Sequence, residues 1–218
     1  ALTSAGYKNL SEYRQKMIKQ IQYANFLLDY IDDHFDDVFN DYYQQCAPKY
    51  VSLIKISVSD TSSPTDDETS KLNEVKELIS NTDKSFGDIA QDYSNDSTSS
   101  KKGSLGIVDS KDTSGIANSY GKDVFNAIEA LSEGQVSDVI TGDNGYYFVK
   151  VTSTDKKTLK KELKKTDIDS PLLAYDDYLQ YVVYNSYKIN YKDKDIKKIV
   201  QEVVNKALEE RKTERGEA

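Results

Sequence analysis

Apolar residues recur at intervals of three and four positions in the first part of the chain. Because an α-helix repeats about every 3.6 residues, this spacing places them along one face of a long helix. Asn9, followed three residues later by Glu12, predicts a capping box at the start of that helix. The residues of the stripe are Leu10, Tyr13, Met17, Ile21, Ala24, Leu28 and Ile31.

The acidic stretch after this helix interrupts the apolar pattern. Asp36 or Asp37 is a candidate N-cap for a second, shorter helix. Pro48 cannot continue a helix, so we expect the helical segment to end there.

The periodicity becomes mixed between about residues 50 and 154. Within residues 51–58, Ile54, Ile56 and Val58 alternate with Leu53 and Lys55, which is typical of a β-strand with two different faces. Further strands are expected at 105–108 and 146–151, a short extended piece at 136–140, helices at 72–79, 86–93 and 124–131, and a turn at 143–145.

Helical periodicity returns after residue 155. Leu159 and Leu163 lie on a lysine-rich helix that Pro171 ends, and residues 175–184 form an aromatic-rich helix candidate. Apolar residues from 196 to 208 predict an amphipathic helix, capped by Asp193 or Asp195.

Helical ends around a mixed centre predict an α+β chain with one insertion. We expect residues 49–154 to form a mixed α/β domain, with residues 1–48 and 155–218 forming one helical domain from both chain ends. The apolar faces of the two ends must be buried somewhere, most simply against each other.

The charge and the aromatic content of the chain indicate which kinds of partner it can bind. The 218 residues carry a net charge of −8, which argues against nucleic acid, since phosphate binding needs clustered Lys and Arg. The chain has 17 Tyr and no Trp; tyrosines suit surfaces that bind other chains transiently, and ordinary core packing is the alternative interpretation.

The chain has few residues that carry redox, metal or nucleophile chemistry. Its only cysteine is Cys46 and its only histidine is His34, so we expect no disulfide, metal site, cofactor or Cys/His nucleophile. No apolar run approaches the roughly 18 residues of a membrane span. The chain opens at Ala1 without Met, so we interpret it as processed or trimmed, and membrane anchoring through a removed N-terminal lipid-modified segment stays open.

Lysines cluster just after residue 155. They could meet an anionic polymer or lipid headgroups, and a solvated helix face is the simpler alternative. They are Lys156, Lys157, Lys160, Lys161, Lys164 and Lys165.

Four short motifs follow one another in the centre of the chain. Together they resemble, in order and spacing, the parvulin family of peptidyl-prolyl isomerases, over about residues 50–153. The motifs are Phe86–Ser94, Asp96–Gly106, Ala130–Ser137 and Gly145–Val151.

The flanks extend the likeness. Gly6-Tyr7-Lys8 and residues 191–196 resemble the extracytoplasmic lipoprotein foldases of Gram-positive bacteria. In those foldases, a parvulin domain is inserted into a helical chaperone domain.

This resemblance implies an altered active site. The two family histidines fall on Lys55 and Tyr147, so both are replaced. The family's catalytic Cys or Asp falls on Asp96, which keeps an acid there, and Lys102 replaces a glycine. By the same resemblance, the substrate pocket falls on Leu105, Tyr120, Val124 and Phe125.

Each site residue also has an ordinary structural alternative. Lys55 can be a solvated charge, Asp96 a loop cap, and Tyr147 a cross-strand packing residue.

The resemblance favours a foldase or chaperone on the outer face of the cell membrane, acting on unfolded or partly folded exported polypeptides. Its parvulin domain is then inactive or weak. The alternatives are an active isomerase centred on Asp96 and an adaptor that reuses the fold. A homodimer is compatible with either.

Overall fold

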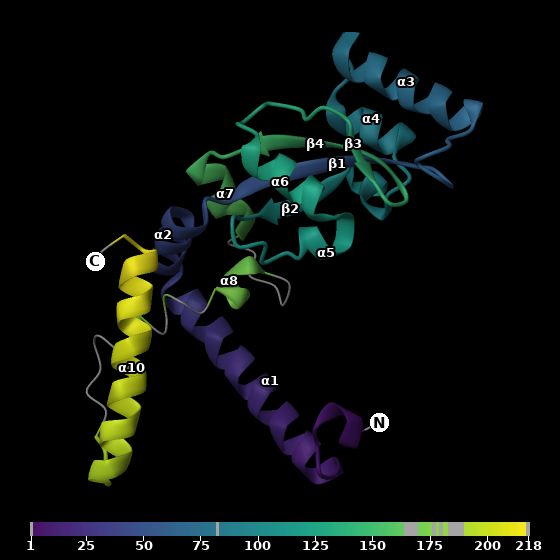
Figure 1. The fold of residues 1–218 in the computed structure, drawn as a ribbon. Helices are drawn as coiled ribbons and strands as arrows, with labels where there is room; N and C mark the ends of the chain where they lie inside the picture. The colour runs from purple at the N-terminus through teal and green to yellow at the C-terminus, as the bar shows by residue number, and fades with distance from the viewer. Residues whose placement is uncertain are drawn as a thin grey trace. The chain divides into compact units, whose positions relative to one another are not determined.

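The computed structural model describes residues 2–81, 83–163, 170–175, 178, 181–182 and 190–216. It divides into two compact units. Residues 46–165 form the central unit, and residues 1–45 with 166–218 form the helical unit. The predicted α+β class, with a central domain inserted between two helical chain ends, is confirmed (Figure 1).

A four-stranded antiparallel sheet of order β2-β1-β4-β3 organises the described part of the central unit (Figure 1). The long strands β1 (Lys49–Ser57) and β4 (Gly145–Ser153) pair at its centre. The shorter strands β2 (Ser104–Val108) and β3 (Ile140–Gly142) lie at its edges.

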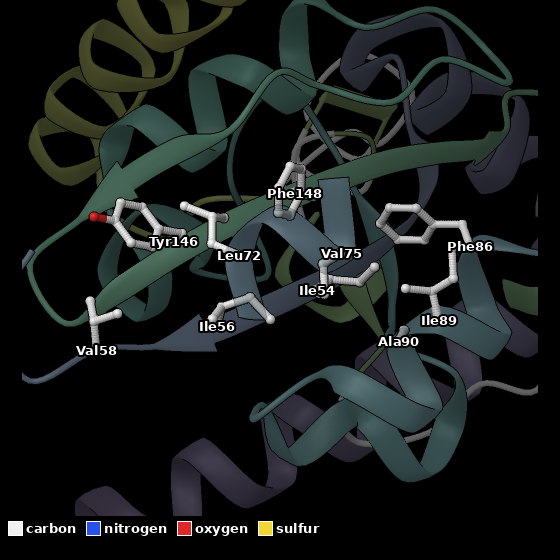
Figure 2. Packing of buried hydrophobic residues seen from close by; sticks show 10 residues of the cluster. All are labelled: Ile54, Ile56, Val58, Leu72, Val75, Phe86, Ile89, Ala90, Tyr146 and Phe148. Atoms are coloured by element: carbon white, nitrogen blue, oxygen red, sulfur yellow. The ribbon is translucent and has the colours of Figure 1, made fainter. Parts of the chain in front are cut away.

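The alternation predicted for residues 51–58 decides what each face of the sheet buries. Ile54, Ile56 and Phe148 point to one face, where they pack with residues of α3 (Asp66–Asn81) and α4 (Phe86–Tyr93), as Figure 2 shows. This cluster also contains Val58, Leu72, Val75, Phe86, Ile89, Ala90 and Tyr146.

The opposite face carries Leu53, Val149 and Tyr147. These residues pack with those of α5 (Ile116–Tyr120) and α6 (Lys122–Ala130). A central sheet buried on both faces therefore fixes which way the side chains of β1 and β4 point.

Two segments of the central unit add detail to the sequence prediction. Helix α5 was not predicted; the side chain of Asp112 accepts hydrogen bonds from the N–H groups of Ile116 and Ala117 and so begins it. In the extended piece expected at 136–140, Val136 forms an isolated bridge with Lys150, and β3 begins at Ile140.

Helix α7 (Lys156–Leu163) groups with the central unit rather than with the C-terminal flank. The residues just before α7 are bound to that unit, because the N–H and Oγ1 of Thr154 donate to the Glu133 carboxylate at 2.8 and 2.9 Å. Asp155 then accepts from the N–H of Thr158 and begins the helix. The observed boundary thus lies later than the expected one at residue 154.

The helical unit begins with η1 (Thr3–Ala5) and the long helix α1 (Leu10–Asp33). The predicted cap of α1 is confirmed, because the Asn9 side chain accepts from the N–H of Glu12.

Helix α2 (Phe35–Cys46) follows α1 almost directly. The proposed cap at Asp36 or Asp37 is wrong: both lie in the first turn, since the carbonyl of His34 already accepts from the N–H of Val38. The helix ends before Pro48, as predicted.

The C-terminal part of the helical unit contains α8 (Pro171–Ala174) and α10 (Lys194–Glu214). Asp193 caps α10, as predicted, by accepting from the N–H groups of Asp195 and Ile196. Most of the aromatic helix expected at 175–184 lies outside the described residues, and so do Lys164 and Lys165.

A small polar network joins three elements of the helical unit. Arg215 pairs with Asp41 of α2, and their side chains are 8% and 10% exposed. The hydroxyl of Tyr175 donates to Asp41 Oδ2 at 2.6 Å, and the ring of Tyr175 packs edge-on against Tyr42. The last described turn is thereby tied to α2 and to the end of α8.

Much of the apolar surface of α1 and α10 remains exposed, contrary to the expectation that the two flanks cover each other. No residue of α10, which is described throughout, is buried. The exposed apolar residues are Leu10, Ile18, Ile21, Tyr23 and Phe26 on α1, and Ile196, Ile199 and Val203 on α10. Among the helices described, none is long and apolar enough to cross a membrane.

Candidate functional site

A cavity of about 400 Å³ opens on the α5/α6 side of the sheet. Its wall is formed by α5 and the start of α6 (residues 117–124), by β3 with the turn that follows it (residues 140–144), and by Tyr147 of β4. The cavity is therefore built from one helix pair and one β-hairpin of the central unit.

The four pocket residues inferred from the family resemblance lie on this side of the sheet. Tyr120 and Val124 line the cavity itself. Leu105 and Phe125 pack, half-buried, against the apolar cluster beneath it and do not line it.

Lys55 and Tyr147 are direct partners across the β1–β4 ladder. The Lys55 ammonium lies 5.7 Å from the centre of the Tyr147 ring, within the range of a cation–π interaction. Among the ion pairs of the described residues, none joins Lys55 to Asp96. Lys55 and Tyr147, the two residues on which the resemblance placed the family histidines, therefore lie next to each other.

Asp96 caps the short helix η2 (Ser97–Lys101). Its Oδ1 accepts from the N–H of Thr98 at 2.9 Å and from Thr98 Oγ1 at 2.7 Å. The hydroxyl of Tyr120 lies 3.4 Å from the same oxygen. Asp96 thus has the structural role of a loop cap and also adjoins the cavity through Tyr120.

The two tyrosines of the cavity pack against each other edge to face, with ring centres 6.2 Å apart. Burial raises the pKa of Tyr120 to about 12, and the negative charge of Asp96 adds to the effect. Burial, followed by the charges of Asp96 and Asp143, also raises the pKa of Tyr147. Both phenols are therefore neutral near pH 7.

Asn144 is a site residue that the sequence reasoning missed. The Tyr147 hydroxyl donates to Asn144 Oδ1 at 2.7 Å, and Asn144 also lines the cavity. Residues 143–145 carried only a turn signal, and nothing in that signal linked Asn144 to Tyr147.

The loop before β2 is shaped by Lys102 and Gly103. Lys102, for which the resemblance implied a family glycine, adopts a left-handed φ of 56°, and its ammonium pairs with Asp88 at 2.7 Å. Position 103, in contrast, has no room for a side chain, because a Cβ on Gly103 would lie 2.4 Å from the carbonyl oxygen of Leu53.

The remaining candidate residues lie away from the cavity. His34 is exposed at the end of α1 and stacks on Tyr30, and Cys46 is buried at the end of α2. The four described lysines of α7 lie along its more accessible side. No cluster of three or more His, Cys, Asp or Glu suited to a metal ion occurs in the part of the chain that is described.

Comparison with known proteins supports the family resemblance. Residues 53–153 match the family model for the PPIC-type PPIase domain, also called rotamase. Foldase protein PrsA of Staphylococcus epidermidis is 32% identical over 141 residues, which are 62% of this chain and 41% of that protein. Foldase protein PrsA of Staphylococcus aureus RF122 has the same identity and coverage.

The chain therefore matches about two fifths of the length of these relatives. Among solved structures, PrsA from Bacillus subtilis aligns with 84% of this chain and 68% of its own, at 21% identity and a TM-score of 0.46.

Proposed function

Starting from a central domain, residues 53–153, that belongs to the PPIC-type prolyl-isomerase family, we propose that this chain is a foldase. Its central unit binds extended segments of unfolded or partly folded polypeptides in the cavity lined by Tyr120, Val124 and Tyr147. Its prolyl-isomerase activity is weak or absent. The similarity to PrsA foldases supports the foldase role.

The pairing of Lys55 with Tyr147 is the main observation that supports weak or absent prolyl-isomerase activity. Prolyl isomerisation crosses a barrier of roughly 18–20 kcal/mol without breaking a covalent bond, so a catalyst needs polar groups that adjust to the twisting amide. At the two family histidine positions this chain has a lysine over an aromatic ring and a phenol whose proton is committed to Asn144. Burial raises the pKa of Tyr147, so its phenol keeps its proton near pH 7.

The exposed apolar residues of α1 and α10 support a holding role for the helical unit. Soluble proteins rarely expose contiguous apolar patches unless those patches meet a partner. Unfolded chains expose apolar side chains of the same kind, which makes them suitable partners.

From the resemblance to the foldases, we also propose where the protein acts and on which polypeptides. The proposed clients are exported proteins, the proposed site of action is the outer face of the cell membrane, and the proposed anchor is a removed N-terminal lipid-modified segment. We keep the domain limits 1–48, 49–154 and 155–218 as a proposal for the two functional parts. The compact units differ from it, because they place α7 with the central unit.

One preparation with two readouts tests the proposed function. A protease-coupled assay on proline tetrapeptides measures isomerisation, and light scattering measures the aggregation of a chemically unfolded protein. We expect the chain to reduce aggregation while leaving isomerisation within about twofold of the uncatalysed rate. Failure to reduce aggregation would contradict the foldase role.

Two variants of Asp96 separate the proposal from its alternative, an active isomerase with an altered site. Asp96→Asn keeps an oxygen that can cap η2 but removes the charge, whereas Asp96→Ala removes both. If the wild type accelerates isomerisation and both variants lose that activity, Asp96 is catalytic and the alternative is correct.

A further inference from the structure

The ring of Tyr147 is fixed by two residues of the β3–β4 hairpin. At its tip, the hydroxyl donates to Asn144 Oδ1 at 2.7 Å. Along its edge, Cε2 lies only 2.7 Å from the point where a Cβ on Gly142 would stand. The ring therefore occupies the space that any other residue at position 142 would need.

Gly142 is required here for space and not for backbone conformation. Its φ lies outside the left-handed region that disfavours side chains, in contrast to Gly121 at 101°. The backbone conformation of Gly142 is therefore one that alanine can also adopt. A substitution at Gly142 thus acts chiefly through the position of the Tyr147 ring.

Gly142, Asn144 and Tyr147 all line the cavity. Other neighbours of the ring include the edge-packed ring of Tyr120, the ammonium of Lys55 and the apolar cluster that the sheet forms with α5 and α6. Tyr147 is only 3% exposed, so a shift of its ring must displace one of these neighbours or enter the cavity.

We propose that Gly142 and Asn144 are positioning residues for Tyr147, and that the ring they hold sets which side chains the cavity admits. This inference rests on the proposed peptide binding. With the ring held in place, the cavity takes a compact ring such as that of proline in an extended peptide. A displaced ring narrows the cavity and rejects it.

The first test is a double-mutant cycle on the full chain. The probe is a fluorescein-labelled alanine peptide with one central proline, and the readout is the Kd from fluorescence anisotropy. We expect Gly142→Ala to raise the Kd about tenfold or more, because its methyl group needs the space that the Tyr147 ring occupies. In a Tyr147→Ala background, the same change should alter the Kd less than twofold, because its target is gone.

Equal effects of Gly142→Ala in both backgrounds would overturn the inference, since glycine would then act independently of Tyr147. If Gly142→Ala alone does not fold, recovery of the folded state in the double variant supports the proposed contact, and its absence contradicts it. Circular dichroism reports which case holds.

A matched pair at Asn144 tests the second contact. Asn144→Ala removes the acceptor of the Tyr147 hydroxyl, and we expect the Kd to rise about fivefold, as for the loss of one hydrogen bond. Asn144→Asp retains an acceptor and should restore the Kd to within twofold of the wild type. An aspartate variant as weak as the alanine variant would contradict the positioning role.

The outcomes separate this inference from the proposed function. A wild type that binds the peptide, with all variants binding equally well, overturns the positioning of Tyr147 alone. A wild type that does not bind the proline peptide overturns the proposed cavity function and the specificity argument together.

Discussion

The central and helical units use the same kind of amphipathic helix with different results. In the central unit, α4 and α6 bury their apolar faces against the sheet, and Ile89 and Ile128 are almost completely inaccessible. In the helical unit, Ile199 of α10 is 62% exposed, and α10 buries no residue.

This difference shows that apolar periodicity predicts a helix but not what covers it. A sheet buried on both faces gives the central unit two packed clusters, one of which supports the cavity wall. The helical unit instead keeps apolar surface exposed to solvent, where another chain can bind it. The two units thus suit different tasks, one a shaped cavity and the other an accessible surface.

Two phenylalanines test this contrast most directly. Phe148 in β4 is 3% exposed, whereas Phe26 in α1 is 53% exposed. We expect Phe148→Ala to lower the free energy of unfolding by about 3–5 kcal/mol, because it leaves a cavity in the core. The control Phe26→Ala should change it by no more than about 0.5 kcal/mol.

Urea denaturation followed by circular dichroism measures both phenylalanine variants. Comparable losses would show that Phe26 is buried in solution, and the contrast between the two units would fail.

A second prediction concerns the buried ion pair of the helical unit. Removing one partner of a buried pair leaves an uncompensated charge, which typically costs about 3–5 kcal/mol. Because Tyr175 still donates to Asp41, we expect a smaller loss of about 2–3 kcal/mol for Arg215→Ala.

Lys206→Ala is the matched control, since Lys206 and Glu210 are 79% and 64% exposed and form an i,i+4 pair. Thermal unfolding distinguishes the two. A control as damaging as Arg215→Ala would show that the Asp41 network does not stabilise the helical unit specifically.

The strongly periodic elements could be predicted from the sequence. The alternation from Leu53 to Val58 gave both the strand β1 and its two faces, and Asn9 and Asp193 marked helix starts that the structure confirms. These signals are local, because they depend on residues within one or two turns.

The features that were missed depend on short or non-local geometry. Helix α5 has five residues, too few to show a period, and its start depends on the Asp112 side chain four residues before Ile116. The contact between Tyr147 and Asn144 depends on how the hairpin turns. Likewise, the exposure of α10 depends on tertiary packing, which periodicity does not encode.

The smallest expected effect is on the titration of Tyr120, which tests whether this side chain of the cavity is buried like the core of the central unit. The pKa of Tyr120 is raised from 10.0 to about 12, chiefly by burial. Below pH 10 this phenol is protonated in both the folded and the unfolded chain, so its contribution to stability is complete. Between pH 10 and about 12 only the unfolded chain loses the proton, and the contribution is lost as the pH rises.

An ultraviolet titration of phenolate, compared between the wild type and Tyr120→Phe, isolates this group among the 17 tyrosines. The difference should be one phenol that titrates near pH 12. Asp96→Asn should move that titration toward lower pH, because the charge of Asp96 is the second cause of the shift. A difference titration centred at pH 10 would mean that solvent reaches the Tyr120 hydroxyl freely. The cavity would then be an open surface like those of α1 and α10, and the division between a packed and an accessible unit would not hold at this site.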